Sequence, residues 1–352
     1  MSTRFSNLEC STLFRVFAVP LLSLGLLSSA PCASAQAEHV PLISGGGGFV
    51  TSTNGGNTSY IPTIVPVLAA PLGPNLLIES RATLLEDFFP KGGGQGYDHT
   101  HFVGVSYIQA DYFATSHLTV VGGYFLTPFG TYSERLSPIW ISNLQDAPII
   151  SPLGTMGNSV LGGQVRGSAY SSSHVSLDYA AYYSGRSSNE QIVSQHATGG
   201  RFEAYFPQQQ LEIGYSYGRV LQGTHSNSNG FHVWWTPQKL PLRVRSQYSH
   251  GAHSQGYWIE TDFRLSKSGG EGSVIGRLEP VFRMQQTFRN SAGGDGLPAQ
   301  DTQRADFGLD YHLPHEVRIN TSYARQFSAS GNKNVWETGI VYRFLFPTWK
   351  GK

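Results

Sequence analysis

Arginines and carboxylates recur at every second position within short segments of this chain. Arg243 and Arg245 are separated by one residue, and Glu260, Asp262 and Arg264 repeat the same spacing. Alternate side chains of a β-strand point to the same face, so this spacing places the charges on one side of a sheet. Guanidinium groups pair with carboxylates through planar hydrogen bonds. A face of this kind can line a water-filled passage and select ions by the sign of their charge.

The residues between these charges are apolar. In segment 242–250, Leu242, Val244 and Tyr248 alternate with the two arginines. An Arg or Lys on the lipid face of a membrane barrel costs ~2–4 kcal/mol at mid-membrane, so the charged face is expected to line water. The residues predicted to face the lumen are Glu79, Arg81, Arg166, Arg201, Glu203, Arg243, Arg245, Glu260, Asp262, Arg264, Glu337 and Arg343.

Segments with this period of two follow one another from Leu77 to Phe346, with no helical period between them. The pattern predicts an all-β fold, a transmembrane antiparallel β-barrel of about 14 strands, with 12–16 within range. The last segment has an aromatic-ended apolar face, formed by Trp336, Thr338, Ile340, Tyr342, Phe344 and Phe346. A final strand that ends in aromatic residues resembles the signal read by outer-membrane assembly machinery. The expected strands are 76–87, 99–110, 117–126, 159–171, 175–185, 198–206, 211–219, 230–236, 242–250, 256–266, 278–288, 303–312, 316–327 and 334–346.

The connectors give the barrel a direction. Links after even-numbered strands are short, whereas those after odd-numbered strands are mostly longer and rich in Gly, Ser and Asn. Outer-membrane barrels have short periplasmic turns and long outer loops, which places the N-terminus in the periplasm. The link Lys267–Arg277 departs from this rule, so either a strand is miscounted or one turn is extended.

The N-terminus reads as an export signal. Arg4 and Arg15 precede an apolar run, 16–27, and small residues end at Ala35, which predicts a signal peptide over 1–35. The alternative is a membrane anchor that is retained. The apolar run is too short for a membrane-spanning helix, which argues against this alternative. Both cysteines, Cys10 and Cys32, lie in this segment. A lipoprotein site at Cys32 is disfavoured by the preceding proline.

Residues 36–75 read as a flexible, Gly- and Pro-rich segment. Gly45 to Gly48 form a tetraglycine run without the Lys of a phosphate-binding loop. The prolines from Pro62 to Pro74 argue against a central strand, because proline removes ladder hydrogen bonds. The expected organisation is thus a signal peptide over 1–35, this segment over 36–75, a barrel over 76–346 and a short tail over 347–352.

The long connector 127–158 is the main candidate for a site. It is rich in apolar residues for a loop in water, and loops of this length are functional or disordered. We expect it to fold into the barrel and narrow the pore, with Tyr132, Glu134, Arg135 and Asp146 facing lumenal arginines such as Arg166, Arg243, Arg245 and Arg264. The alternative is a loop packed on the rim, on an extracellular cap or on a neighbouring subunit.

Two segments resemble a known family. The stretch Gly123–Leu136, a strand running into Pro-Phe-Gly and then Tyr-x-Glu-Arg, looks like a hairpin of porins in the phosphate-selective porin O/P-like group. Pro71–Arg81 is also similar to that group. The resemblance implies a porin, whereas phosphate selectivity depends on clustered basic residues and this chain has only six lysines, so that property is not carried over.

The predicted function is passive diffusion of small hydrophilic solutes or ions through a bacterial outer membrane. The full chain has a formal net charge of +1, so nothing indicates nucleic acid. The expected partners are outer-membrane lipid, the assembly machinery and the solutes, and a homotrimer is left open. No catalytic residue, metal or cofactor is predicted: His99 and His101 share a face but have no third ligand. The alternatives are a non-conducting barrel that sheaths or anchors a periplasmic partner, and an outer-membrane hydrolase.

Overall fold

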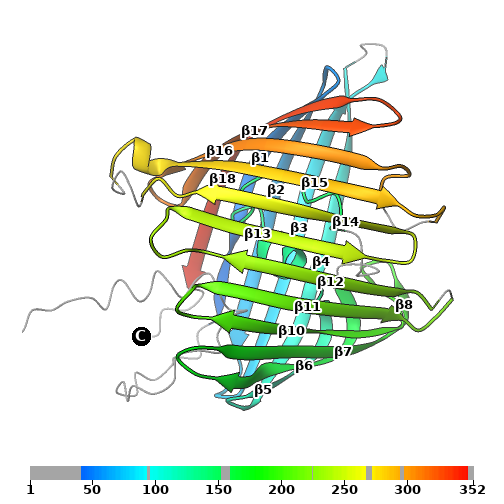
Figure 1. Ribbon diagram of the computed structural model, residues 1–352, viewed down its shortest axis with the longest axis vertical. Coiled ribbons are helices and arrows are strands. Elements are labelled where there is room, and N and C mark those ends of the chain that lie inside the picture. Colours follow the sequence, from blue (N-terminus) through cyan, green and yellow to red (C-terminus); the bar gives the residue numbers. More distant parts are fainter. Residues whose placement is uncertain are drawn as a thin grey trace, which may run out of the picture. The chain divides into compact units, whose positions relative to one another are not determined.

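The computed structural model describes residues 41–92, 96–151, 159–223, 225–266, 272–293 and 297–347. The predicted signal peptide with both cysteines lies outside the described residues, as does the predicted tail 347–352 except for Pro347, which ends the last strand. Within the described chain, the strands form one closed antiparallel barrel of 16 strands, in which the first strand pairs with the last (Figure 1).

All 14 predicted strands are present, and most begin and end within three residues of the prediction. Two further strands precede them, so the estimate of about 14 was low. The barrel strands are β1 (Leu42–Asn54), β2 (Asn57–Pro71), β3 (Leu76–Pro90), β4 (Tyr97–Thr115), β5 (Leu118–Leu126), β6 (Ser159–Ser171), β7 (Ser176–Gly185), β10 (Ala197–Phe206), β11 (Leu211–Val220), β12 (Asn227–Trp235), β13 (Leu242–His250), β14 (Ser254–Phe263), β15 (Leu278–Arg289), β16 (Thr302–Leu313), β17 (Val317–Ser328) and β18 (Lys333–Pro347).

The prediction of a flexible segment over 36–75 was wrong for most of its described part, which begins at residue 41. Residues 42–54 and 57–71 are β1 and β2, which close the barrel between β18 and β3. Pro62 and Pro66 are compatible with a barrel strand because both lack their N–H group on the same side of β2, the side that faces β3. Pairing with β1 is continuous across Pro62 and Pro66, whereas pairing with β3 is interrupted at 61–62 and 65–66. Two prolines four residues apart therefore remove donors on the same side and leave the opposite ladder intact.

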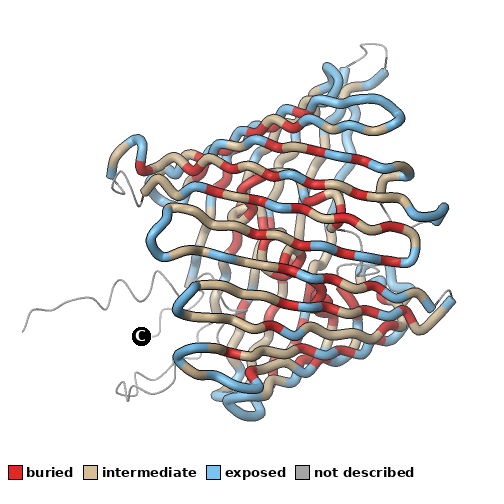
Figure 2. The backbone as a smooth tube through the Cα atoms, in the orientation of Figure 1, coloured by how far each residue is buried: buried red, intermediate tan, exposed pale blue. Residues whose placement is uncertain are grey.

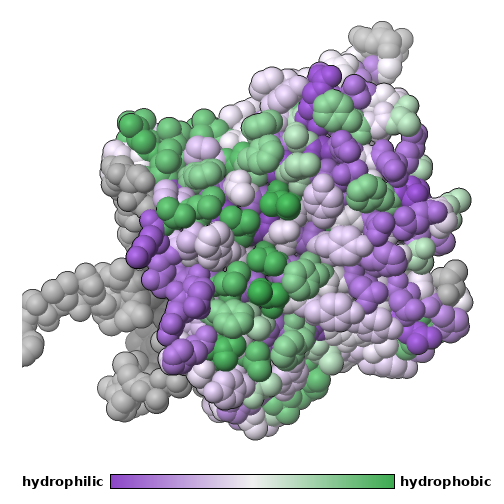
Figure 3. Space-filling view, viewed as in Figure 1, coloured by the Kyte–Doolittle hydropathy of each residue, from purple (hydrophilic) through white to green (hydrophobic). Residues whose placement is uncertain are grey.

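The two faces of each strand separate as the period of two predicts. On β14, Trp258, Glu260 and Asp262 are buried while Ile259 and Phe263 are exposed. Buried positions alternate with exposed ones along most of the strands (Figure 2). Apolar side chains are grouped on the outer face of the strands in Figure 3, with hydrophilic residues toward the loops. The barrel is thus apolar outside and polar inside, as expected for a wall in contact with lipid.

The short and long connectors still alternate. Two additional strands at the start do not change which connectors follow odd-numbered strands and which follow even-numbered strands. The link 264–277 remains long, and its described part includes a short 3-10 helix, η3 (Ile275–Arg277). The described residues of this link, 264–266 and 272–277, contain no strand. The link 186–196 contains a small hairpin, β8 (Ser187–Asn189) and β9 (Ile192–Ser194). None of the helical turns in the described chain has the length and hydrophobicity needed to span a membrane.

Candidate pore constriction

The connector after β5 folds into the barrel. Its described part, residues 127–151, is called the inward loop here. Although it follows a strand end, many of its side chains are shielded from solvent: Thr127, Leu144 and Ile150 are at most 2% exposed. It contains one π-helical turn, η2 (Tyr132–Leu136). Its polar groups bond to side chains of β3, β10, β11, β13, β15, β16 and β17. The loop is therefore held by the wall on several sides of the lumen.

Glycines in the wall make room for the apolar side chains of the inward loop. At Gly46 on β1, a Cβ atom would lie 2.6 Å from Cε3 of Trp140, and at Gly48 it would lie 2.7 Å from Cδ1 of Ile139. Carbon atoms in contact are normally ~3.5–4.0 Å apart, so a side chain at either position would force the loop residue to move. The glycine run of β1 thus receives the loop. Three other wall glycines have a loop side chain within 3.0 Å of their would-be Cβ: Gly230 with Phe129, Gly256 with Ile150 and Gly308 with Leu144.

The first ionic anchor of the loop joins η2 to β10 and β11. Glu134 pairs with Arg201. Arg135 donates from Nη1 to Oε1 of Glu212 at 2.6 Å and from Nη2 to Oε1 of Glu203 at 3.1 Å. Since these side chains are mostly shielded from water, their attraction is screened less than that of a surface pair.

The second anchor lies near the end of the inward loop. Asp146 accepts from Nη2 of Arg304 at 2.6 Å, and its carbonyl oxygen accepts from Nη2 of Arg283 at 2.8 Å. The backbone N–H of Ile149 donates to Oε1 of Gln285 at 2.8 Å. These contacts connect the loop to β15 and β16.

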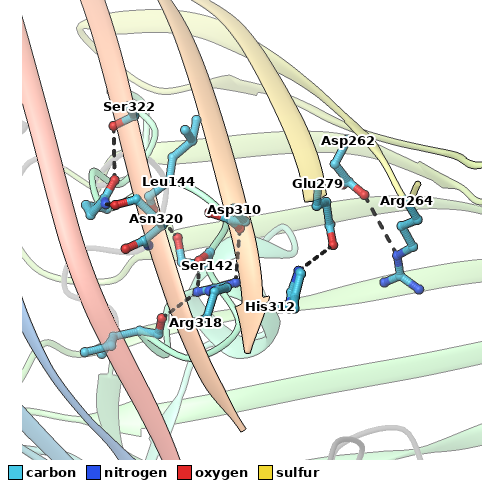
Figure 4. A network of polar contacts seen from close by, with 12 residues as sticks. Ser142, Leu144, Asp262, Arg264, Glu279, Asp310, His312, Arg318, Asn320 and Ser322 are labelled. Carbon is cyan, nitrogen blue, oxygen red and sulfur yellow. Dashed lines mark hydrogen bonds and ion pairs between the residues drawn. The ribbon is translucent and has the colours of Figure 1, made fainter. Parts of the chain in front are cut away.

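The third anchor is Arg318 on β17, shown in Figure 4. Its Nη2 donates to the carbonyl oxygens of Ile139, at 3.0 Å, and Ser142, at 2.5 Å, while Nη1 lies 3.3 Å from Oδ2 of Asp310. Arg318 therefore satisfies loop carbonyls and neutralises a carboxylate that is fully buried. Next to it, Ser322 and Asn320 bond to Gln145 of the loop.

Tyr132 belongs to the inward loop and lies against the wall. It packs against the apolar cluster of Leu136, Ile150 and Trp258, together with Trp234. Desolvation raises the pKa of Tyr132 to about 12. The side chain therefore helps to seat the loop on the wall, and does not stand alone in an aqueous passage.

The lumenal arginines predicted to face the loop pair mostly with the wall instead. Arg166 binds Asp111 at 2.8 Å. Arg243 bridges Asp262 and Glu279, and Arg245 pairs with Glu260 and Asp262. Arg264, just beyond the end of β14, approaches Asp262 at 4.0 Å, and its side chain is 42% exposed. The arginines that bind loop carboxylates are Arg201 and Arg304, whereas within the described residues Arg166, Arg243, Arg245 and Arg264 form no ion pair with the loop.

The remaining predicted residues also lie on the inner face. Arg81 donates to Oγ of Ser137 at 3.3 Å, and Glu79 is buried on the same strand. Glu337 is buried next to Ser52 and Ser322. Arg343 shares the strand face of Glu337, on which Val341 is also buried.

Several lumenal groups were missed by sequence reasoning: His232, Arg283, Arg304, Asp310 and Arg318. All of them lie on predicted strands, and Arg304, Asp306 and Asp310 share one face at the same two-residue spacing that identified the other charges. The two-residue spacing was thus sufficient to place these residues on the lumenal face. Their side-chain contacts depend on which strands are neighbours across the lumen.

One group of side chains could hold a cation. Oxygen atoms of Glu203 and Glu212 and a ring nitrogen of His232 all lie within 4.8 Å of one another. They come from β10, β11 and β12, next to the first ionic anchor. The sequence predicted no metal site, since these residues are far apart along the chain.

The barrel is similar to solved outer-membrane proteins. OmpF of Salmonella typhi, in a complex with daunomycin, aligns with a TM-score of 0.58 at 11% identity, covering 86% of this chain and 97% of that chain. The fold is that of an outer-membrane porin. An anion-selective porin from Comamonas acidovorans aligns with a TM-score of 0.54 at 10% identity, covering 87% of this chain and 98% of its own.

An OmpT of Vibrio cholerae lacking loop L8 gives a TM-score of 0.51 at 12% identity over 87% of this chain and all of that chain. At these identities the likeness concerns the fold alone. No protein-family model matches the sequence, and no curated protein matches it significantly.

Proposed function

We propose that this chain is a porin-like channel of the bacterial outer membrane for small hydrophilic solutes or ions. The observation that carries the proposal is a closed barrel with a charged inner face, into which the inward loop folds. A porin fold, an apolar outer face and a loop that narrows the lumen are the parts that passive diffusion with size selection needs. The short turns and the N-terminus lie on the periplasmic side in this proposal, and the segment 1–35 directs export.

The constriction is formed by the inward loop, with Glu134, Arg135 and Asp146 as its charged edge and Tyr132 as a packing residue. Arg201 and Arg304 hold this edge against the wall. Membership in the phosphate-selective porin O/P-like group rests on the resemblance of Gly123–Leu136, which contains the end of β5 and the start of the loop. The solutes, outer-membrane lipid and the assembly machinery are the proposed partners, and trimerisation follows only by analogy with porins.

One observation favours a second function, a barrel that does not conduct. At the level of the loop, lumenal charges are almost completely shielded: Asp262 and Asp310 are 0%, Arg283 1% and Arg245 2% exposed. Such a filled interior suits a structural barrel that sheaths or anchors a periplasmic partner.

The test is single-channel recording of the purified protein in planar bilayers with a salt gradient. A channel gives discrete current steps and a reversal potential that reports its charge preference. Deleting residues 130–150 should increase the conductance, because it removes the constriction and leaves the strand ladders. Unchanged conductance after the deletion would contradict the constriction, and no current from either protein would favour the structural barrel.

A further inference from the structure

A compact group of potential metal ligands lies on the inner wall where β10, β11 and β12 are neighbours. In the sheet register, Glu203 is opposite Gly214, and Gly214 is opposite His232. Glu212 precedes Gly214 by two residues and therefore faces the same side. Three strands thus bring two carboxylates and one imidazole to one place, although they are distributed over 203–232 in the sequence.

Gly214 makes the approach possible. A Cβ atom at this position would collide with the imidazole ring of His232, and it would lie 3.0 Å from Cγ of Glu203. The ring of His232 therefore lies over the bare backbone of Gly214, between the two carboxylates. Any larger residue at 214 would push the ring away.

Two of the three distances match those between ligands on one ion, and the third, between oxygens of Glu203 and Glu212, is within 4.8 Å. Nε2 of His232 lies 3.2 Å from Oε1 of Glu203 and 3.4 Å from Oε1 of Glu212. Zinc binds nitrogen and oxygen at ~2.0–2.2 Å in tetrahedral geometry, which puts adjacent ligand atoms ~3.3–3.6 Å apart. Two carboxylate oxygens and one imidazole nitrogen are also a donor set suited to zinc and similar divalent ions.

A second, independent observation is the state of His232. It is 1% exposed, and neither ring nitrogen makes a hydrogen bond within the part of the chain that the structure describes. Nε2 is directed at the two carboxylates, at 3.2 Å from Glu203 and 3.4 Å from Glu212. A buried polar group without a hydrogen bond is costly. Coordination of a cation would satisfy Nε2.

We propose that Glu203, Glu212 and His232 form a site for a divalent cation of the zinc class, and that Arg135 of the inward loop competes for it. The guanidinium of Arg135 binds the same two oxygen atoms, at 3.1 Å on Glu203 and 2.6 Å on Glu212. An ion ~2.1 Å from Oε1 of Glu212 would be within ~4.7 Å of Nη1 of Arg135, and the two like charges would repel each other.

Arg201 is the second cation at this site, with Nε 3.0 Å from Oε1 of Glu203. Arg201 also pairs with Glu134, so it can keep that partner when an ion is bound by Glu203, Glu212 and His232. Within the described part of the chain, Arg135 forms ion pairs with Glu203 and Glu212 and with no other carboxylate. Binding of the ion therefore weakens the first ionic anchor, and a divalent cation would favour release of the inward loop.

Metal binding is tested on the purified, detergent-solubilised full barrel. Co²⁺ titrations followed by visible absorption, with Zn²⁺ as competitor, should show one saturable site with absorption typical of nitrogen and oxygen ligands. Glu212→Gln and His232→Asn should each weaken binding by at least about 100-fold, because loss of even an outer partner costs ~10–100-fold. Arg135→Gln should tighten binding by about tenfold, since the competitor is gone.

Two matched controls separate the site from adventitious binding. His174→Asn removes an exposed histidine, and Glu337→Gln removes a buried carboxylate elsewhere in the lumen; neither should change the affinity. No saturable Co²⁺ site, or equal binding by His232→Asn and by the unaltered protein, would overturn the site. Unchanged affinity in Arg135→Gln would overturn the competition. These readouts do not depend on conductance, so they stand if the channel proposal fails.

Discussion

Substitution of Gly46 by alanine should dislodge the inward loop. The new Cβ would lie 2.6 Å from Cε3 and 3.2 Å from Cδ2 of Trp140, and 3.2 Å from the carbonyl oxygen of Tyr342. To reach an ordinary carbon–carbon separation of ~3.6 Å, the indole ring must move by ~1 Å. Overpacking of this kind costs ~1–3 kcal/mol. The ratio of docked to released loop should therefore fall by about 5- to 150-fold.

The matched control is the neighbouring residue. Gly47 faces outward, and a Cβ there would lie 3.7 Å from the nearest atom, the carbonyl oxygen of Thr63, which is ordinary contact. Gly47→Ala therefore changes the same strand and the same residue type without touching the loop. Trp140→Ala in the Gly46→Ala background should relieve the clash.

The assay is single-channel recording in planar bilayers, together with reversible urea unfolding in lipid vesicles followed by tryptophan fluorescence. Gly46→Ala should show larger or more frequently fluctuating currents and a lower unfolding free energy than Gly47→Ala. The added Trp140→Ala should reverse the loss of stability caused by the clash. If Gly46→Ala and Gly47→Ala behave alike in both measurements, the glycine run does not seat the loop and the reasoning fails.

Further predictions concern charge and pH. Arg318→Met should lower the free energy of unfolding in vesicles by ~3–5 kcal/mol, because it leaves Asp310 buried without its cation. The double variant Arg318→Met with Asp310→Asn should lose clearly less stability. Additive losses from the two substitutions would contradict the pairing. Asp146→Asn should cost under ~1 kcal/mol in the same assay, because the Asp146 side chain is 39% exposed in its pair with Arg304, and a loss as large as that of Arg318→Met would refute this ranking. The raised pKa of Tyr132, about 12, means that the docked loop retains a proton that a free tyrosine loses near pH 10. Loop docking should therefore be independent of this group below about pH 10 and weaken as the pH rises toward 12; Tyr132→Phe should lose less stability over that range, and equal losses would exclude Tyr132 as the cause.

The strand order, the two faces of the wall and the position of the long loop were predictable from the sequence. Each depends on a local pattern, the period of two or the length of a connector, which a strand in any barrel must obey. The alternation of 256–266 correctly separated Glu260 and Asp262 from Ile259 and Phe263. The same local reasoning failed for 42–71, because a run of glycines and spaced prolines has no apolar–polar contrast to detect.

The sequence by itself determined a barrel with an apolar outside and a charged inside. Successive side chains of a strand point to opposite faces, so the position of a residue along the strand decides which face it occupies. Only the tertiary structure decided which charges meet. Arg201 and Arg304, not Arg243 or Arg264, bind the loop, because the path of 127–151 across the lumen depends on where glycines leave space for Ile139, Trp140 and Leu144. His232 came beside Glu203 and Glu212 for the same reason: barrel register, and the missing side chain of Gly214, bring together residues that the sequence keeps apart.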